Sequence, residues 1–390
     1  MRNGIRLLAT LALALPSLAI AAPGGAATDK VANGSGSSYE ALPMDQWITD
    51  VQSKGLILNY NPDGTAAGQQ DYIDGKTVDF VASDLPFRVA GDKLAGLGPQ
   101  KVPWGFSYVP GVAVGTAFLY HISVDGHLVT NLRLSGQTLL EIFTGRITNW
   151  DNPQITRDYG HKLPDLTIRP VIHEELSGLT YYFTYWMSHE FPDQWNAFCR
   201  KVDPGISLPC GATEVYPQFG HAQGEEGSNE VADYVTSADG NGAIGYVETP
   251  YAAGTGYPVL ELGNAAGKYV RPAPPAVTTA LSLAEINENP SSPDYLQEDL
   301  NNVYASKNPA VYPLSSYSYV VVPRAGTKLP PVFTTSAGRT LSGFLGYTLC
   351  AGQSQLPKMD IPKLPANLQA GGLLQVKDIP GHGSVPAHCP

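Results

Sequence analysis

Small polar residues occur in four short segments of the chain, in a pattern typical of anion binding. Three segments lie in the first quarter of the sequence, at residues 34–39, 64–68 and 82–86, and the fourth lies at residues 173–180. They are rich in hydroxyl and backbone N–H groups, and the first two run into segments expected to be helical. Because a helix N-terminus carries unpaired N–H groups and partial positive charge, the pattern predicts a site for a small oxyanion.

The elements expected around the first three segments form an α/β arrangement. Apolar periodicity predicts a helix at residues 44–53, a strand at 56–60, a helix at 69–73 and a strand at 78–82. Strands that alternate with helices indicate a parallel sheet covered by helices. Ligands bind such sheets at the carboxyl ends of the strands, which is where the three small-residue segments fall.

The rest of the chain continues this alternation. Further strands are expected at residues 103–120, 167–172, 242–247 and 317–322, and further helices at 135–145, 181–190, 230–236 and 340–351. The strand at 103–120 is long enough to leave one lobe and enter another, and the strand at 242–247 can return. The Pro-rich tail from residue 357 is expected to be partly irregular.

The N-terminus has the features of an export signal. Arg2 and Arg6 precede an apolar run at residues 7–19, and small residues at 19–21 and 26–27 offer two cleavage sites. The apolar run is too short for a transmembrane span, and no lipid-attachment Cys follows it. We therefore expect a secreted, cell-wall-associated or periplasmic protein without a transmembrane span.

Size and charge limit the possible folds and partners. Removal of the leader leaves roughly 360 residues, which favours two lobes over one simple core. The formal charge of −11 argues against nucleic acid or an anionic membrane as a partner. A small anion can still bind, because nearby dipoles outweigh distant, screened charges.

The four cysteines agree with export. Cys199 and Cys210 flank a short loop with Pro and Gly, and a disulfide there would stabilise the fold by about 2–3 kcal/mol. Cys350 and Cys389 are the remaining pair. They either form a bridge that holds the tail, or Cys350 is buried and Cys389 is a loose thiol.

Five segments together resemble the PstS-type phosphate-binding proteins, which are the substrate-binding subunits of the bacterial phosphate ABC transporter. The segments are residues 34–39, 64–68, 78–86, 139–150 and 242–248, and the resemblance extends in order from about residue 31 to residue 380. Residues 199–210 and 313–319 are most similar to actinobacterial members. The resemblance implies an α/β, two-lobed type II periplasmic-binding-protein fold. Each lobe has a mixed or parallel sheet flanked by helices, and two crossover strands join the lobes.

The resemblance also implies how the chain is divided. The expected parts are a signal peptide at 1–27, a first lobe at 28–112 and 251–378, a second lobe at 113–250 and a tail at 379–390, with crossovers near 110–119 and 244–250. The anion binds in the cleft, and the lobes close on it by a hinge motion. The implied function is capture of inorganic phosphate, or a related oxyanion, for import by an ABC permease. We expect a monomer with no cofactor and no metal.

Matching positions give the ligand-binding residues of the first lobe. Ser38 and Tyr39 would supply a hydroxyl and a backbone N–H, Thr65 would supply the same groups, and Asp84 matches the family's carboxylate. An ionised Asp only accepts hydrogen bonds, so it favours phosphate, which carries a proton, over sulfate, which does not. Each residue has a structural alternative: Ser38 can cap a helix, Thr65 can shape a turn, and Asp84 can brace a loop.

The fourth segment departs from the family pattern. Where the family has Arg, Asp, Gly and then Ser-Gly-Thr, this chain has His173, Glu175, Leu176, Ser177, Gly178 and Leu179, with Thr180 next. Of these, His173, Ser177, Gly178 and Leu179 are the expected ligand-binding positions. Ser177 and Gly178 still open a helix and offer backbone amides.

The loss of the Arg should weaken binding. A charge-assisted hydrogen bond contributes about 1.5–3 kcal/mol, so its loss weakens binding about ten- to a hundredfold. A His with an ordinary pKa is mostly neutral at pH 7, and Glu174 and Glu175 oppose an anion. If these glutamates or the anion hold His173 protonated, binding is stronger in acid.

Two other functions remain open. A secreted or wall-associated PstS-like protein with a lost or changed ligand, acting as a non-transport binding or interaction protein, is favoured by the altered fourth segment and the missing lipid-attachment Cys. A different small ligand is the other possibility. We do not expect an enzyme, because the sequence has no Gly-x-Ser-x-Gly, His-Glu-x-x-His or Walker motif, and its eight His are scattered.

Overall fold

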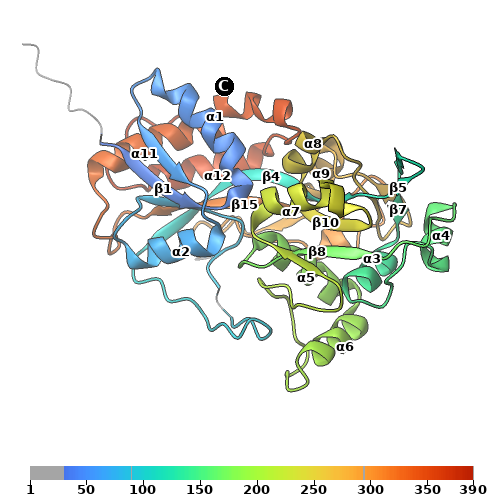
Figure 1. The fold of residues 1–390 in the computed structure, drawn as a ribbon. Helices are drawn as coiled ribbons and strands as arrows, with labels where there is room; N and C mark the ends of the chain where they lie inside the picture. Colours follow the sequence, from blue (N-terminus) through green and yellow to red (C-terminus); the bar gives the residue numbers. More distant parts are fainter. Residues whose placement is uncertain (1–29, 89, 293–294, 390) are drawn as a thin grey trace, which may run out of the picture.

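The structure is a computed structural model that describes residues 30–88, 90–292 and 295–389 of the 390-residue chain. The signal peptide expected at residues 1–27 lies outside the described residues. An eight-stranded sheet runs through the molecule in the order β2-β1-β3-β15-β4-β10-β8-β9 (Figure 1). Its strands are β1 (Ala32–Gly36), β2 (Leu58–Asn61), β3 (Phe80–Ser83), β4 (Phe106–Tyr120), β8 (Arg169–His173), β9 (Gln223–Glu225), β10 (Ala243–Glu248) and β15 (Ser315–Pro323).

Helices flank this sheet, and short strands form three smaller sheets. The α-helices are α1 (Ala41–Gln52), α2 (Thr65–Asp74), α3 (Gly136–Phe143), α4 (Pro153–Tyr159), α5 (Gly178–Glu190), α6 (Pro192–Val202), α7 (Gly227–Thr236), α8 (Thr249–Thr255), α9 (Pro274–Leu281), α10 (Asn301–Tyr304), α11 (Thr335–Leu349) and α12 (Ala366–Lys377). The 3-10 helices are η1 (Ser38–Glu40), η2 (Ala238–Gly240), η3 (Ala351–Ser354) and η4 (Leu356–Met359). The short strands are β5 (Ser123–Val124), β6 (His127–Leu128), β7 (Arg133–Leu134), β11 (Glu261–Gly263), β12 (Tyr269–Val270), β13 (Glu285–Ile286) and β14 (Glu298–Asp299).

Strand β4 connects the two halves of the sheet. Its residues 106–115 pair with β15, and its residues 116–120 pair with β10, both in antiparallel orientation. All of its residues except Phe106 are buried, because the strand is covered on both faces. The long strand expected at 103–120 is therefore present and passes from one half of the molecule to the other.

Two large apolar clusters fill the halves. The first gathers residues of α1, α11 and α12 on β1, β3, β15 and the first part of β4. The second gathers residues of α3, α5 and α6 on β8, β10 and the end of β4 (Figure 1). Leu260, Leu262 and several residues of 300–314 belong to the second cluster. These residues lie after the expected boundary at 250, yet they pack in the second half of the molecule. The lobe boundaries at 112 and 250 stay a prediction.

Most expected helices and strands are present, with shifted ends. Helix α2 begins at Thr65 rather than at residue 69, so the segment 65–68 is its first turn and not a loop. Gly68 makes this possible, because a Cβ there would lie 2.5 Å from the Cα of Gly36 on β1. The helix therefore starts directly beside the strand end.

The tail from residue 357, expected to be partly irregular, contains a helix that was not predicted, α12. Gly371 and Gly372 weaken the helical pattern in the sequence, since glycine is a poor helix former. In the structure these glycines allow close packing: a Cβ on Gly371 would lie 2.8 Å from Leu296, and one on Gly372 2.8 Å from Leu349. Tertiary contacts therefore stabilise a helix that local propensity does not predict.

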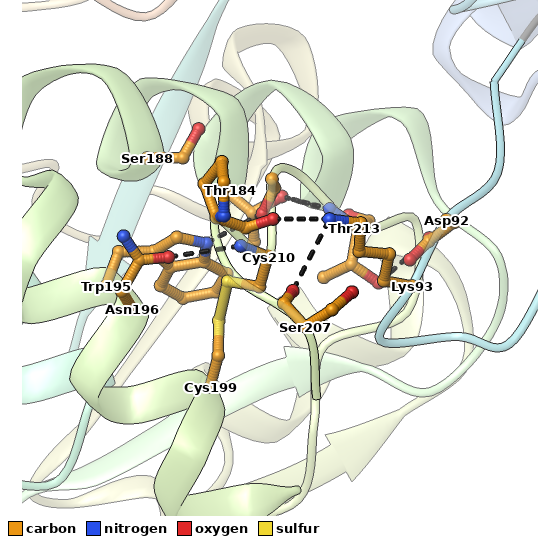
Figure 2. Close-up of a disulfide and its surroundings, with 12 residues drawn as sticks. Asp92, Lys93, Thr184, Ser188, Trp195, Asn196, Cys199, Ser207, Cys210 and Thr213 are labelled. Carbon is orange, nitrogen blue, oxygen red and sulfur yellow. Dashed lines mark hydrogen bonds between the residues drawn. A yellow bond between two sulfur atoms is a disulfide. The ribbon is translucent and has the colours of Figure 1, made fainter. Parts of the chain in front are cut away.

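The expected disulfide is present, and of the two alternatives for Cys350 and Cys389 the structure has the bridge. Cys199 of α6 pairs with Cys210 in the following loop (Figure 2). The Trp195 indole N–H donates to the Gly211 carbonyl at 2.7 Å and fixes the loop against the helix. The second bridge joins Cys350, after α11, to Cys389 in the tail. It anchors the described end of the chain to the first apolar cluster.

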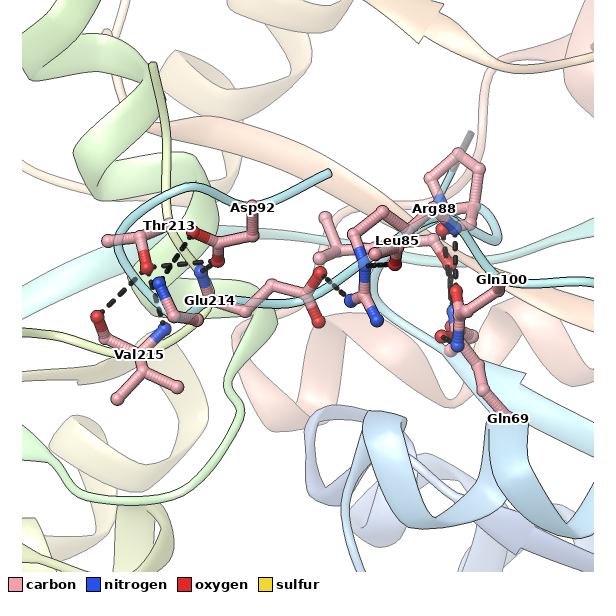
Figure 3. Close-up of polar contacts among 12 residues, drawn as sticks. Gln69, Leu85, Arg88, Asp92, Gln100, Thr213, Glu214 and Val215 are labelled. Atoms are coloured by element: carbon pink, nitrogen blue, oxygen red, sulfur yellow. Dashed lines mark hydrogen bonds and ion pairs between the residues drawn. The ribbon is translucent and has the colours of Figure 1, made fainter. Parts of the chain in front are cut away.

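A long segment after β3 contacts the loop that follows this first disulfide. Arg88 Nη1 lies 2.5 Å from Glu214 Oε1, and Asp92 Oδ2 accepts from the Thr213 hydroxyl at 2.9 Å (Figure 3). Asp92 also accepts from the Glu214 backbone N–H at 2.7 Å. These contacts tie residues 88–92 to residues 213–214 by means of charged and polar groups. No helix in the described part of the chain is long and apolar enough to span a membrane.

Candidate functional site

The turn after β1 contributes Ser37, which the sequence analysis did not assign. Its hydroxyl donates to Asp84 Oδ1 and accepts from the Tyr39 backbone N–H, the latter at 3.0 Å. The Tyr39 N–H expected to hold the ligand is therefore occupied. The Ser38 hydroxyl has no hydrogen-bond partner among the described residues, so it stays available beside this turn. A signal for Ser37 was its position just before a helical turn, where serine is a preferred cap.

The N-terminus of α2 lies next to Asp84. Thr65 Oγ1 accepts from the Asp84 backbone N–H at 3.0 Å, so Thr65 both starts the helix and braces the loop after β3. The backbone N–H groups of Thr65, Ala66 and Ala67 have no partner within the described residues. Burial raises the pKa of Asp84 to about 6, although hydrogen bonds with Ser37 and Thr65 oppose the shift.

The N-terminus of α5 meets Asp84 from the other half of the molecule. Ser177 caps the helix by accepting from the Thr180 N–H at 3.4 Å. The N–H groups of Gly178 and Leu179 have no partner in the described part of the chain. A Cβ on Gly178 would lie 2.2 Å from the Asp84 Cβ, so only glycine allows this approach. The structure thus brings the ends of β1 and β3 and the starts of α2 and α5 to one place.

His173 is buried at the end of β8 and both ring nitrogens are engaged. Nδ1 lies 2.7 Å from Glu175 Oε1, and Nε2 lies 3.0 Å from the Tyr246 carbonyl oxygen. Both partners are acceptors, so the ring is an imidazolium that donates twice. Burial disfavours this charge, but the hydrogen bond to Glu175 and its charge raise the pKa of His173 above its usual range.

This geometry corrects the expectation of a neutral His173 that faces the anion. Both N–H groups point to protein acceptors, so neither is left for a ligand, and the ring acts through its charge alone. The alternative in which a neighbouring glutamate holds the ring protonated is the one that the geometry supports. The sequence could not decide between them, because the partner carbonyl belongs to Tyr246, far along the chain.

The adjacent glutamates diverge. Glu175 Oε2 accepts from the Gly227 N–H at 3.2 Å, at the start of α7. Burial opposes ionisation, but His173 and this N–H lower the pKa of Glu175, so it is an ionised and paired carboxylate. The side chain of Glu174 lies instead against Gly224 of β9, where a Cβ would be 2.0 Å from Glu174 Oε1. The pair therefore presents less negative charge to the site than the sequence indicated.

Two further carboxyl groups near Asp84 were missed. Glu40 and Glu248 are both buried, and Glu248 Oε2 and both carboxyl oxygens of Glu40 have no hydrogen-bond partner among the residues described. Burial raises the pKa of Glu248 to about 7 and that of Glu40 to about 8, and the charge of Asp84 contributes to both shifts. The sequence does not show which carboxyl groups are buried. The only signal for Glu248 was its position as the last residue of segment 242–248, one of the five segments of the resemblance.

Leu179 and Thr180 do not replace the family's threonine. The Leu179 side chain is buried in the second apolar cluster, so this residue offers only its backbone N–H. Thr180 Oγ1 lies 2.6 Å from the Tyr246 hydroxyl, inside the core. Within the described residues no group of three or more His, Cys, Asp or Glu is arranged to hold a metal ion.

The fold agrees with that of known proteins. The family model described as a PBP superfamily domain matches residues 21–351, so the chain belongs to the PBP superfamily. The fold is the mixed α/β, type II fold of these proteins.

Curated relatives name a narrower group. The phosphate-binding protein PstS of Xylella fastidiosa is 28% identical over 339 residues, which are 86% of this chain and 82% of that protein. The phosphate-binding protein PstS 2 of Mycobacterium tuberculosis is 27% identical over 351 residues, 87% of this chain and 85% of that protein. The crystal structure of an ancestral soluble variant of the human phosphate binding protein has the same fold, with a TM-score of 0.64 at 17% identity over 87% of this chain and 92% of that one.

Proposed function

We propose that the protein captures inorganic phosphate, or a closely related oxyanion, between its halves and delivers it to an ABC permease. The observation that carries this proposal is the approach of the α5 N-terminus to Asp84, beside the N-terminus of α2. The N–H groups of Thr65, Ala66, Gly178 and Leu179 there have no protein partner among the described residues, and helix N-termini favour anions. The names of the curated relatives support the same ligand.

The carboxyl groups favour an anion that carries protons. An ionised Asp84 accepts the hydrogen of a protonated phosphate, and a neutral Glu248 can donate to one of its oxygens. Sulfate has no proton near neutral pH, so it would face Asp84 without a hydrogen bond. Affinity is expected to be lower than in relatives with an Arg in the fourth segment, because His173 contributes charge but no N–H to the ligand.

The remaining parts of the proposal concern the whole chain. Residues 1–27 serve as the export signal, and the mature protein acts outside the cytoplasm as a monomer. The lobes are 28–112 with 251–378, and 113–250, and they close on the ligand. The protein binds and hands over its ligand without transforming it, as the names of its relatives as binding proteins suggest.

A calorimetric titration at pH 8, where Asp84 is ionised, tests the ligand. We expect phosphate to bind, and sulfate to bind about ten- to a hundredfold more weakly, because an unrelieved acceptor–acceptor contact costs about 1–3 kcal/mol. Asp84→Asn should reduce this discrimination, since an amide can donate to sulfate. Asp74→Asn, at the exposed end of α2, is the matched control. Absence of heat and of any thermal shift with millimolar phosphate would contradict the proposal and favour a lost or changed ligand.

A further inference from the structure

A second site lies beside the first. A cavity of about 570 Å³ opens between the loop after β3, helix α5, the loop at 209–214 and strand β14. This volume is within the usual range of small-molecule sites. Its wall begins at Leu85, next to Asp84, and the hydroxyl of Tyr182 in the same wall donates to the Asp84 carbonyl at 3.1 Å. The cavity therefore lies next to the proposed phosphate site, on the far side of the Asp84 backbone.

The positive groups of the cavity wall are already paired. Arg88 makes its ion pair with Glu214, and its Nε donates to the Gly98 carbonyl at 2.9 Å (Figure 3). Lys93 donates to the Pro209 carbonyl at 2.7 Å, near the first disulfide. Both cationic side chains of the described cavity wall thus have protein partners, so the wall does not favour an anionic ligand.

One carboxyl group of the wall has an oxygen without a partner among the described residues. Glu298 Oε2 is buried and accepts no hydrogen bond from the described residues, while Oε1 accepts from the Tyr317 N–H at 3.3 Å. Asp299, the next residue, also lines the cavity. An unpartnered buried carboxyl oxygen is costly, so a donor or a cation in the cavity would relieve it.

Aromatic side chains line the same cavity. Tyr181, Tyr182 and Tyr185 of α5 and Tyr319 of β15 line the cavity, and the rings of Tyr181 and Tyr185 are parallel with centroids 5.9 Å apart. Aromatic faces attract ammonium groups, most strongly where water is excluded. We propose that this cavity binds a small organic cation, with its ammonium group at Glu298 and its carbon atoms against the tyrosine rings.

The protonation of Glu298 sets the conditions of the test. Burial raises the pKa of Glu298 to about 8, opposed by the Tyr317 N–H. The other ionisable groups around it are Tyr182, Tyr304, Tyr317 and Tyr319, whose pKa values are all raised by burial, and the carboxyl of Asp299. At pH 9 the tyrosines stay neutral while Glu298 is ionised. Cation binding should therefore be tighter at pH 9 than at pH 6.

Calorimetric titration of the full mature protein with choline and with tetramethylammonium, at pH 9, tests the proposal. We expect one cation per protein and an affinity at least tenfold lower in Glu298→Gln. Glu288→Gln, which removes an exposed carboxylate outside the cavity, should match the wild type. Tyr185→Leu, which removes a half-buried ring from the wall, should also weaken binding and provides a second test if the Glu298 variant is unstable.

The result must also separate the two sites. Choline should bind both with and without saturating phosphate, and it should bind even if phosphate does not. Absence of choline heat in the wild type, equal affinity in Glu298→Gln, or loss of choline binding with phosphate would overturn a separate cation site.

Discussion

The partners of single ionisable residues decide how much charge an anion meets in this protein. His173 and Glu175 neutralise each other, and Glu175 also accepts an N–H of α7. Asp84 and Glu248 have no such counter-ion, and burial raises the pKa values of both, to about 6 and about 7. The charge of the site is thus most sensitive to pH in the range where phosphate itself changes protonation.

Phosphate affinity should rise as the pH falls from 8 to 6. Groups with a raised pKa take up protons in this range, so repulsion of the anion decreases and the neutral carboxyl of Glu248 can donate. Calorimetry at several pH values should show a smaller increase in phosphate affinity for Glu248→Gln than for the wild type. Between pH 8 and pH 6 the two increases should differ by about tenfold, since one pKa unit is a factor of ten. At each pH the wild type and the variant are exposed to the same protonation states of phosphate, so the difference between their pH profiles is due to the protein. Identical profiles would contradict a role for Glu248.

Among the elements, η1 has an unusual position, because it places Glu40 in the core beside β4 and β15. A Cβ on Gly111 of β4 would lie 2.3 Å from Glu40 Oε1 and 2.5 Å from Ser318 Oγ. Burial raises the pKa of Glu40 to about 8, so the folded protein holds this proton much more tightly than the unfolded chain. The junction between turn and sheet therefore holds a carboxyl group that is neutral at pH 7.

Stability should consequently depend on pH through this element. The contribution of Glu40 is fully present below its unfolded pKa of about 4.5 and is lost as the pH rises through about 8, with a slope of up to about 1.4 kcal/mol per pH unit. Urea unfolding at pH 5, 6, 7 and 8 should show a smaller decline for Glu40→Gln than for the wild type. Glu298 also has a raised pKa and remains in both proteins. The exposed Glu285→Gln should decline like the wild type; if Glu40→Gln does too, Glu40 is ionised in the fold.

How far elements could be predicted depended on how local their signals are. Strands β3, β4, β8, β10 and β15 are apolar runs, and the sequence predicts each of them within a few residues. The start of α2 was missed, because its first turn consists of small residues that also fit a loop. Helix α12 was missed because its glycines are favourable only in contact with Leu296 and Leu349.

The candidate site was predictable to a similar extent. The segments that meet at Asp84 were recognised, since small residues at strand ends leave a local signature. The contact between Ser37 and the Asp84 carboxyl was not, because it depends on the course of one turn. The buried acids Glu40 and Glu248 were not assigned either, since nothing local distinguishes a buried carboxyl from an exposed one.

At the scale of the whole molecule, polar contacts between residues 88–92 and 213–214 hold the proposed lobes together. Asp92 is buried and accepts from the Thr213 hydroxyl, the Glu214 N–H and the Ala95 N–H. The Arg88–Glu214 ion pair lies beside it (Figure 3). None of these groups touches the proposed phosphate position, so we expect them to act on the proposed closure of the lobes.

Asp92→Ala should therefore weaken phosphate binding without altering its selectivity. The lost contacts and the unpaired Glu214 N–H cost about 1–3 kcal/mol in the closed form, which corresponds to roughly ten- to a hundredfold in affinity. Stopped-flow measurements should locate this loss in the rate of release. Asp74→Ala, on the exposed end of α2, should leave the rate unchanged. An unaltered release rate in Asp92→Ala would mean that the contact does not hold the closed form.

The course of β4 limits how this molecule can open. The strand exchanges its neighbour β15 for β10 between Gly115 and Thr116, without leaving the sheet. The junction is therefore a hydrogen-bonded strand and not a flexible loop. One half can rotate only if strand β4 itself twists. A twisted strand resists large rotations and returns the two halves to the same strand pairing. Each cycle of uptake and release should therefore restore the same arrangement of the N-termini of α2 and α5.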